Sequence, residues 1–465
     1  METLSSREFG DRDRGGLLRF LSHCKARVDS DGEPRIASIS LRVRDLDPLA
    51  VLQSIHESDQ PHLYLERGSV SVSGAEAVVK VSVEGRDRFS KAQQFVHLWS
   101  SRIIATGDLD GWFSGPLFFH AFSFDEQNNP AGTVFIPKWQ VCRTDQDCVA
   151  VANVKVDGQT DMEREADRIL RAHGAFSNAT YFQPKDRSEL GPVTVEAEDP
   201  DHFLERVSKA LEAINRGEVS KVVLARWMDL VAGKEFHPLE TLATLREAYP
   251  DCFSFSFSRG TGASWIGATP ERLMRLSRGQ FETEAIAGSV PRGKGLAEDA
   301  KLGGRLLSSD KDLREHEFVV GTIRRVLEGI GLTPNIGRQP HLLRLSNVQH
   351  LRTPISGKIT PDISLMQLVE ELHPTPAVGG VPKQEASRLI GKLEPFVRGL
   401  YTGCLGWEKP GGEGESVVAL RTARMEGPRA RLFAGAGIVD GSSPDLELLK
   451  TEIKLGAMAG ALGAI

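Results

Sequence analysis

Hydrophobic and polar positions follow two periods along the chain, and the change between them predicts an alternation of strands and helices. In the first part, four segments alternate apolar with polar positions or form short apolar runs, as strands do. They are residues 34–43, 74–85, 115–124 and 132–143. Residues 90–104 instead have helical spacing. We therefore expect an α+β region over residues 1–190, in which no motif indicates a chemistry.

A change of composition near residue 190 marks the expected boundary between two regions. Residues 188–203 combine glycine, proline and several acidic residues, which is typical of a connection. A helix is expected next, with Asp201 as its cap. Its apolar positions are Phe203, Val207, Ala210, Leu211 and Ile214. Residues 195–465 then form a second region, which is dense in strands, glycine turns and single charges within apolar runs.

Lys221 is one of these charges, inside the segment 219–226, which reads VSKVVLAR. Because strand side chains alternate, Lys221 shares a face with Val219 and Val223. An edge-strand lysine that faces solvent fits this pattern as well as a buried functional lysine does. In the second case, desolvation favours a neutral amine, which can accept a proton as a general base.

Glu271 and Arg421 also stand next to apolar segments. Glu271 follows a strand that is expected to end in GATP, and a side chain at such a position can project into a cleft. A plain surface carboxylate is the simpler interpretation of a lone glutamate. Arg421 is expected inside a strand over residues 416–425, where its guanidinium needs a carboxylate and can hold one bidentately.

A helix is predicted over residues 308–331, capped near Asp310. Asp312 and Glu315 fall on one face of it, and carboxylates on one helix face suit a hard cation such as magnesium. A solvated acidic first turn explains the same pattern, because the helix dipole favours negative charge there. His316 is expected to be structural, since it lacks the spacing of a zinc-binding helix.

Two segments near the C-terminus carry further candidates. Residues 371–383 hold three prolines and two adjacent glycines, so they predict a rigid loop that can present His373 at a fixed angle. The final helix is expected over residues 444–458. Its apolar stripe is Leu446, Leu449 and Ile453, and its other face carries Glu447, Lys450 and Lys454.

Composition narrows the class of protein. The chain has 465 residues, 40% hydrophobic and 26% charged, which is ordinary for a globular protein. Its net charge of −6 disfavours nucleic acid as the main partner. Five scattered cysteines without a C-x-x-C pair argue for a reducing compartment and against a disulfide framework or zinc site. No secretory signal or membrane-length apolar stretch is recognised, so a cytoplasmic location is expected.

The motifs of residues 200–465, taken in order, resemble the chorismate-utilising enzymes and, among them, the isochorismate synthases. They are KVVLAR, GATPE, AGSVPRG, KDLREHEFV, LHPTPAVGG, VALRTA, AGAGIV and a closing E-x-x-K-T-x-x-K. No single motif is specific, but the ordered set is. The resemblance implies an α+β chorismate-utilising enzyme fold of layered antiparallel β-sheets with helices packed outside. Within it, residues 195–465 would be the chorismate-binding catalytic region.

The resemblance also implies roles for individual residues. Lys221 would activate the water that attacks C2 of chorismate, and Glu271 would protonate the departing C4 hydroxyl. Relatives that use ammonia typically lack this lysine, so no amidotransferase subunit is expected. The expected substrate contacts are Gly288, Ser289, His373, Arg421, Gly435 and Lys454. The expected ligands of a magnesium ion, Mg2+, are Glu315 and Glu447.

One position departs from the family pattern. That pattern ends in S-x-P-x-x-E-W-x-E-T-x-x-K, whereas residues 442–454 read SSPDLELLKTEIK, so Lys450 replaces a metal-ligating glutamate. Glu452 lies about 140° around the helix from Glu447 and cannot substitute without a shift of the helix. Two outcomes stay open. In the first, magnesium still binds, although more weakly, because it keeps several waters and needs few protein ligands. In the second, Lys450 turns away or pairs with Glu315.

The motifs favour an active, magnesium-dependent isochorismate synthase, most similar to the menaquinone-type enzymes. The alternative enzyme is a salicylate synthase, which goes on to eliminate pyruvate. The alternative from another class is a chorismate-binding protein that has lost catalysis through Lys450. The expected partner is the small molecule chorismate, with no nucleic acid and no membrane.

Overall fold

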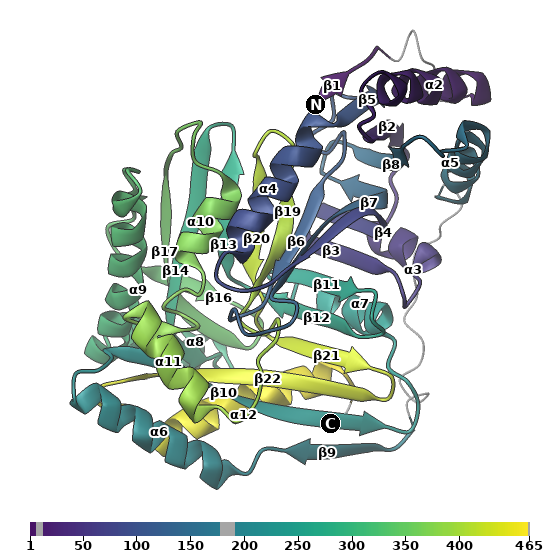
Figure 1. The fold of residues 1–465 in the computed structure, drawn as a ribbon. Helices are drawn as coiled ribbons and strands as arrows, with labels where there is room; N and C mark the ends of the chain where they lie inside the picture. Colours follow the sequence, from purple (N-terminus) through teal and green to yellow (C-terminus); the bar gives the residue numbers. More distant parts are fainter. Residues whose placement is uncertain (6–12, 177–190, 464–465) are drawn as a thin grey trace.

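Strands and helices alternate along residues 1–5, 13–176 and 191–463, which this computed structural model describes (Figure 1). The helices are α2 (Arg14–Asp31), α3 (Pro48–Ile55), α4 (Arg88–Ser101), α5 (Met162–Phe176), α6 (Pro200–Asn215), α7 (Pro238–Ala248), α8 (Leu296–Leu307), α9 (Asp310–Gly329), α10 (Leu365–Leu372), α11 (Lys383–Leu393) and α12 (Pro444–Ala461).

The strands of the first part are β1 (Glu2–Thr3), β2 (Arg35–Val43), β3 (Pro61–Arg67), β4 (Val70–Val83), β5 (Ile103–Gly107), β6 (Phe118–Phe122), β7 (Gly132–Arg143) and β8 (Cys148–Val156). Those of the second part are β9 (Val193–Ala197), β10 (Lys221–Ala232), β11 (Phe253–Arg259), β12 (Ser264–Thr269), β13 (Arg272–Ser277), β14 (Gln280–Pro291), β15 (Asn335–Ile336), β16 (His341–Arg344), β17 (Val348–Lys358), β18 (Gly380–Val381), β19 (Cys404–Glu408), β20 (Gly414–Val418), β21 (Thr422–Glu426) and β22 (Arg429–Val439).

The strands form two layers that meet at β7. The first layer runs β9-β10-β22-β21-β12-β11-β3-β4-β7-β8-β2-β5. The second runs β7-β6-β19-β20-β13-β14-β17. Residues 132–135 of β7 pair with β6, whereas residues 139–143 pair with β8, so one long strand belongs to both layers. Among the described strands, β5 alone makes parallel pairings, with β1 and β2.

Apolar side chains from both layers fill the space between them. This core includes Leu63 of β3 and Phe255 of β11 from the first layer, and Leu405 of β19 and Val417 of β20 from the second. Helices cover the outer faces (Figure 1). Helices α8 and α9 pack on β14 and α10 on β13, while α6 and α12 pack on β10 and β22. The expected α+β fold of layered antiparallel sheets with outer helices is therefore confirmed.

The chain crosses from one layer to the other at two of the candidate residues. Glu271 lies between β12 and β13, and Arg421 lies between β20 and β21. The crossings are tied to the neighbouring strands, since the N–H of Val418 donates to the Glu271 carbonyl at 3.1 Å and that of Ala268 to the Arg421 carbonyl at 3.2 Å. The prediction of one strand over residues 416–425 is therefore wrong, because Arg421 has a left-handed φ of 47° and interrupts it.

Of the other predicted segments, one strand and one helix are confirmed and the connection near residue 190 is wrong in part. The strand over residues 132–143 is confirmed with the same bounds as β7, and residues 90–104 hold most of α4. The connection over residues 188–203 is wrong in part, because β9 lies within it and pairs with β10. Asp199, two residues before the expected Asp201, caps α6. Residues 177–190 lie outside the described part, and the division near residue 190 stays a prediction.

The final helix turns its polar face inward. Glu447, Thr451 and Leu455 of α12 are buried, whereas the apolar stripe of Leu446, Leu449 and Ile453 is exposed. The periodicity identified the two faces correctly, but the apolar face is the one that contacts solvent. No helix among the described residues is long and apolar enough to cross a membrane. The five cysteines are free and buried.

Candidate active site

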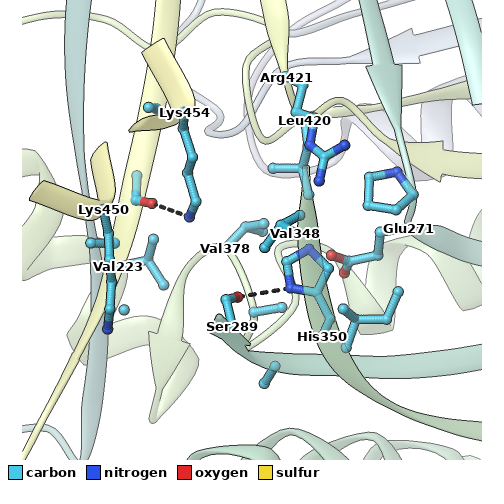
Figure 2. Close-up of a pocket in the computed structure, with 18 of the residues that line it drawn as sticks. Val223, Glu271, Ser289, Val348, His350, Val378, Leu420, Arg421, Lys450 and Lys454 are labelled. Atoms are coloured by element: carbon cyan, nitrogen blue, oxygen red, sulfur yellow. Dashed lines mark hydrogen bonds between the residues drawn. The ribbon is translucent and has the colours of Figure 1, made fainter. Parts of the chain in front are cut away.

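A cavity of about 190 Å³ lies between the two layers, where the crossings bring them together. Strands β10 and β22 and helix α12 form one side of it, and β14, β17 and the two crossings form the other. Figure 2 shows Lys450 and Lys454 on one side and Arg421, Glu271 and His350 on the other. The predicted site residues that line the cavity are Lys221, Glu271, Gly288, Ser289, Glu315, Arg421, Gly435, Glu447 and Lys454.

Lys221 is buried in the first layer rather than exposed at a sheet edge. It pairs with Val439 of β22 on one side and with Val381 of β18 on the other, and it is 1% exposed. Its Nζ lies 2.9 Å from Oε1 of Glu315 on α9. Gly437 makes room for this contact, because a Cβ there would come within 2.9 Å of that oxygen. A buried lysine held by one carboxylate at a cavity wall is suited to proton transfer.

Glu271 is the buried acid of the cavity. It is 4% exposed, and its Oε1 accepts a hydrogen bond from the Thr375 hydroxyl at 3.2 Å. Burial and, to a smaller extent, the nearby charge of Glu284 raise the pKa of Glu271 to about 8. The carboxyl group is therefore protonated at neutral pH and can donate a proton to a bound molecule. This rules out the surface-carboxylate interpretation.

Arg421 presents a guanidinium to the cavity. Among the described residues, no carboxylate lies within ion-pair distance of it. Its Nη1 lies 3.6 Å from the sulfur of Cys252, and its guanidinium carbon lies 5.6 Å from the ring centre of Tyr249. A partly buried arginine without a carboxylate partner can bind an anionic group of a ligand in a bidentate way.

Lys454 and Gly435 form a second polar wall. The Lys454 ammonium donates to the Gly435 carbonyl at 2.8 Å, as Figure 2 shows. Burial, together with the charges of Lys450 and Arg421, lowers the pKa of Lys454 to about 8. Gly435 has to lack a side chain, because a Cβ there would come within 2.8 Å of the Tyr401 hydroxyl. The β22 backbone can therefore approach a ligand closely.

Gly288 and Ser289 lie at a bulge of β14. The register with β17 shifts between Ala287 and Ser289, and Gly288 takes a φ of 73°, which favours glycine. Beyond the bulge, the Ser289 hydroxyl bonds Nδ1 of His350 at 2.7 Å. Burial lowers the pKa of His350 to about 3, so the ring is neutral. The pair can exchange hydrogen bonds with a ligand without adding charge.

His373 does not reach the cavity, which corrects its prediction as a substrate contact. Its Nε2 lies 3.3 Å from the Ser123 carbonyl, and its ring packs 6.2 Å from that of Phe89. Burial lowers its pKa to about 3, so it is a neutral core residue. The rigid loop still reaches the cavity, through Ala377 and Val378. The loop was identified correctly, but its histidine points away from the cavity.

Sequence reasoning missed some residues that line the cavity. They are His350, Tyr249 and Tyr401. His350 lies in a strand, and a histidine there is usually a core residue, so its spacing carries no signal. Only the β14 bulge, which aims Ser289 at the ring, identifies it.

The two expected magnesium ligands are already paired with lysines. Glu315 contacts Lys221, and the buried Glu447 carboxylate lies 2.9 Å from Lys450 and 3.4 Å from Lys311. Although burial alone would raise it, these three ammonium groups hold the pKa of Glu315 below its usual value. Among the described residues, no three His, Cys, Asp or Glu side chains are grouped as metal ligands. An ammonium cannot ligate a cation, so the residues present do not fit Mg2+.

A protein-family model matches almost the whole chain. The model, described as chorismate binding enzyme, matches residues 19–463 and so covers nearly the whole described chain. It includes residues 19–190 as well as the motifs of the second region. The two regions predicted from the sequence are therefore matched together by one family.

The relatives and a solved structure point the same way. The chain is 34% identical to the salicylate biosynthesis isochorismate synthase of Pseudomonas aeruginosa, over 97% of this chain and 94% of that protein. It is 34% identical to the isochorismate synthase MenF of Bacillus subtilis, over 75% of each chain. Its fold matches that of MenF, the menaquinone-specific isochorismate synthase from Escherichia coli, with a TM-score of 0.76, 25% identity and coverage of 96% and 99%.

Proposed function

The chain belongs to the family of chorismate-binding enzymes, and we propose that it is an isochorismate synthase, an isomerase that converts chorismate to isochorismate. One observation carries the proposal. A buried amine, Lys221, and a protonated buried carboxyl, Glu271, line the same cavity, which also holds unpaired positive charge for an anionic substrate. A reaction that adds water at one carbon and removes a hydroxyl at another needs such a base and acid.

Lys221 is proposed to act as the base. The Lys221 ammonium first releases its proton to solvent, and the amine then removes a proton from a water molecule, whose oxygen forms a bond to C2 of chorismate. Glu315 acts as the positioning residue, since its carboxylate holds the Lys221 amine at 2.9 Å and balances the charge that Lys221 gains. The surrounding strands β18 and β22 restrict the amine to this direction.

Glu271 is proposed to act as the acid. As the new C2–O bond forms, both conjugated double bonds of the ring shift by one position and the C4–O bond breaks. Glu271 gives its proton to that oxygen, which leaves as water. One water enters and one leaves, so substrate and product are isomers. Glu271 then takes up a proton from solvent, and the proton that Lys221 accepted can be released to solvent in the next cycle.

Arg421 and Lys454 are proposed to bind the two carboxylates of chorismate. Both side chains face the cavity, and their positive charges lie on opposite sides of it (Figure 2). The Gly435 backbone lies beside Lys454, and Gly288 and Ser289 contribute polar groups from β14. Fixing both carboxylates would orient C2 and C4 toward the base and the acid.

Menaquinone biosynthesis is the pathway we propose. The similarity of fold to the menaquinone-specific enzyme supports it, with 99% of that structure covered. Salicylate biosynthesis is the competing pathway, because the Pseudomonas aeruginosa relative is matched over 97% of this chain. Both of these proteins are named isochorismate synthases, so the first reaction is the same in the two pathways.

Product analysis tests the proposal. Purified protein is incubated with chorismate, with magnesium and separately with EDTA, and the products are separated by chromatography and identified by ultraviolet spectrum. We expect isochorismate. Release of salicylate and pyruvate would identify a salicylate synthase instead. Chorismate binding without any product would indicate a non-catalytic binding protein.

A further inference from the structure

Lys450 places a fixed positive charge where the family resemblance expects a magnesium ligand. It lies one helical turn after Glu447 and one turn before Lys454, so all three side chains share the inward face of α12. Its Nζ lies 2.9 Å from the Glu447 carboxylate, and its side chain lines the cavity (Figure 2). Lys450 therefore has not turned away, and its partner is Glu447 rather than Glu315.

The side chains around Glu315 and Glu447 already supply the positive charge that a metal ion would supply there. Three ammonium groups, those of Lys221, Lys311 and Lys450, surround the two carboxylates of Glu315 and Glu447. A glutamate at position 450 would reverse this balance and leave excess negative charge. Exchanging glutamate for lysine adds two units of positive charge, which is the charge that a magnesium ion carries. A dication added to the present cluster would be repelled.

Lys450 also keeps donors free for a ligand. An ammonium has three N–H donors, and among the described residues the hydrogen-bond partner of Lys450 is Glu447 alone. The side chain is 40% exposed, toward the cavity that it lines. Burial and, after it, the charge of Lys450 lower the pKa of Lys454 on the cavity wall. The ammonium can therefore bridge Glu447 and a carboxylate of a bound substrate.

We propose that the ammonium of Lys450 takes the place of the divalent cation, so that this chain binds and converts its substrate without magnesium. The inference rests on the proposed isochorismate synthase activity. Lys450 neutralises a carboxylate of chorismate directly, and Glu447 holds the ammonium in place from its buried position.

Two substitutions at position 450 test this role. Lys450→Glu restores the family pattern, and Lys450→Met removes the charge while keeping the length of the side chain. In EDTA, we expect either variant to lose on the order of 10–100-fold in kcat/KM, the cost of one charged hydrogen bond. Magnesium should restore activity to Lys450→Glu but not to Lys450→Met. Lys358→Met is the control, because Lys358 is an exposed lysine at the end of β17 outside this cluster and should keep the wild-type rate.

Calorimetric titration with magnesium chloride gives a readout that does not depend on turnover. We expect no saturable heat with the wild-type chain and saturable binding with Lys450→Glu, both in the presence of chorismate. Full wild-type activity in EDTA would support the inference. Isochorismate formation that requires magnesium would overturn it while the proposed function stands. If no protein forms isochorismate, the proposed function fails, and tight magnesium binding by the wild-type chain would overturn the inference as well.

Discussion

Lys221 and Glu271 are both buried at the same cavity, but their partners differ. Lys221 contacts a carboxylate of Glu315, while Glu271 meets the hydroxyl of Thr375 and the negative field of Glu284. A carboxyl group in such surroundings keeps its proton. A carboxylate beside an amine instead balances the positive charge that the amine carries once it has accepted a proton. The division of acid and base therefore follows from which neighbours each residue has.

Substitution of Lys221 by arginine separates charge from proton transfer. Lys221→Arg keeps a positive group opposite Glu315, but a guanidinium stays protonated and cannot act as a base. We expect kcat for isochorismate formation to fall by at least about 10²-fold, with thermal unfolding little changed. Lys358→Arg is the control, because Lys358 is an exposed lysine at the end of β17. A near-normal rate for Lys221→Arg would refute the general-base role.

The pH dependence of rate and stability tests the protonated state of Glu271. Because its pKa is about 8, against an ordinary value of 4.5, the folded chain holds this proton more tightly than the unfolded chain does. Its contribution to stability is present below pH 4.5 and is lost as the pH rises to about 8. The rate should fall over the upper end of that range, as Glu271 loses its proton.

Glu271→Gln isolates this effect, because Lys454 also titrates near pH 8. The variant should form no isochorismate, and its melting temperature relative to the wild type should rise between pH 5 and pH 9. Thermal unfolding followed by circular dichroism at several pH values gives the difference. A difference that stays constant with pH would mean that Glu271 is ionised in the folded chain.

At the scale of elements, α12 shows how a functional helix differs from an ordinary amphipathic one. Its inward face carries Glu447, Lys450 and Lys454, because these groups line the cavity, and Leu446 and Leu449 face solvent. The apolar residues that anchor the helix lie further along, at Leu455 and Met458. The stability of the helix in the fold therefore depends on its second half.

Two leucines of α12 provide a matched pair for this orientation. Leu455 is 1% exposed and Leu449 is 51% exposed, on the same helix. We expect Leu455→Ala to lower the free energy of unfolding by about 2–5 kcal/mol, because it leaves a cavity. Leu449→Ala should change it by less than about 0.5 kcal/mol. Denaturant unfolding of both variants measures this, and equal losses would mean that the helix presents the other face to the core.

Sequence reasoning was most reliable for elements whose side chains serve packing alone. The segment 132–143 has β7's bounds because packing decides both of its faces. The interior charges were harder, since burial of Lys221 depends on pairing to both β18 and β22, which lie far away in the chain. Arg421 was assigned to a strand because a left-handed residue leaves no mark on hydrophobic alternation.

The candidate site was found from motifs rather than from periodicity. Glu271 could be named because it follows an apolar segment and Arg421 because it interrupts one, but their meeting at the layer crossings needs the whole fold. His373 was misplaced, since a loop's rigidity says nothing about the direction of its side chains. Lys450 was expected to turn away or to pair with Glu315, whereas it pairs with Glu447, one turn before it on the same helix.

At the scale of the whole molecule, the site exists because two sheet layers share one long strand and because the chain crosses between them at Glu271 and Arg421. The first layer supplies the base on β10, the second supplies Ser289 and His350, and the crossings supply the acid and the arginine. Helices α9 and α12 close the cavity with the paired glutamates and lysines. Every part of the proposed reaction therefore depends on both layers being in place.

The most direct test of this account is the origin of the new hydroxyl oxygen. Chorismate is converted in water labelled with heavy oxygen, and the product is analysed by mass spectrometry with fragmentation. The account predicts isochorismate that carries the label in its C2 hydroxyl, and a strong loss of this product with Lys221→Arg. Isochorismate without the label would show that the hydroxyl moves within the substrate, and it would contradict water activation by Lys221.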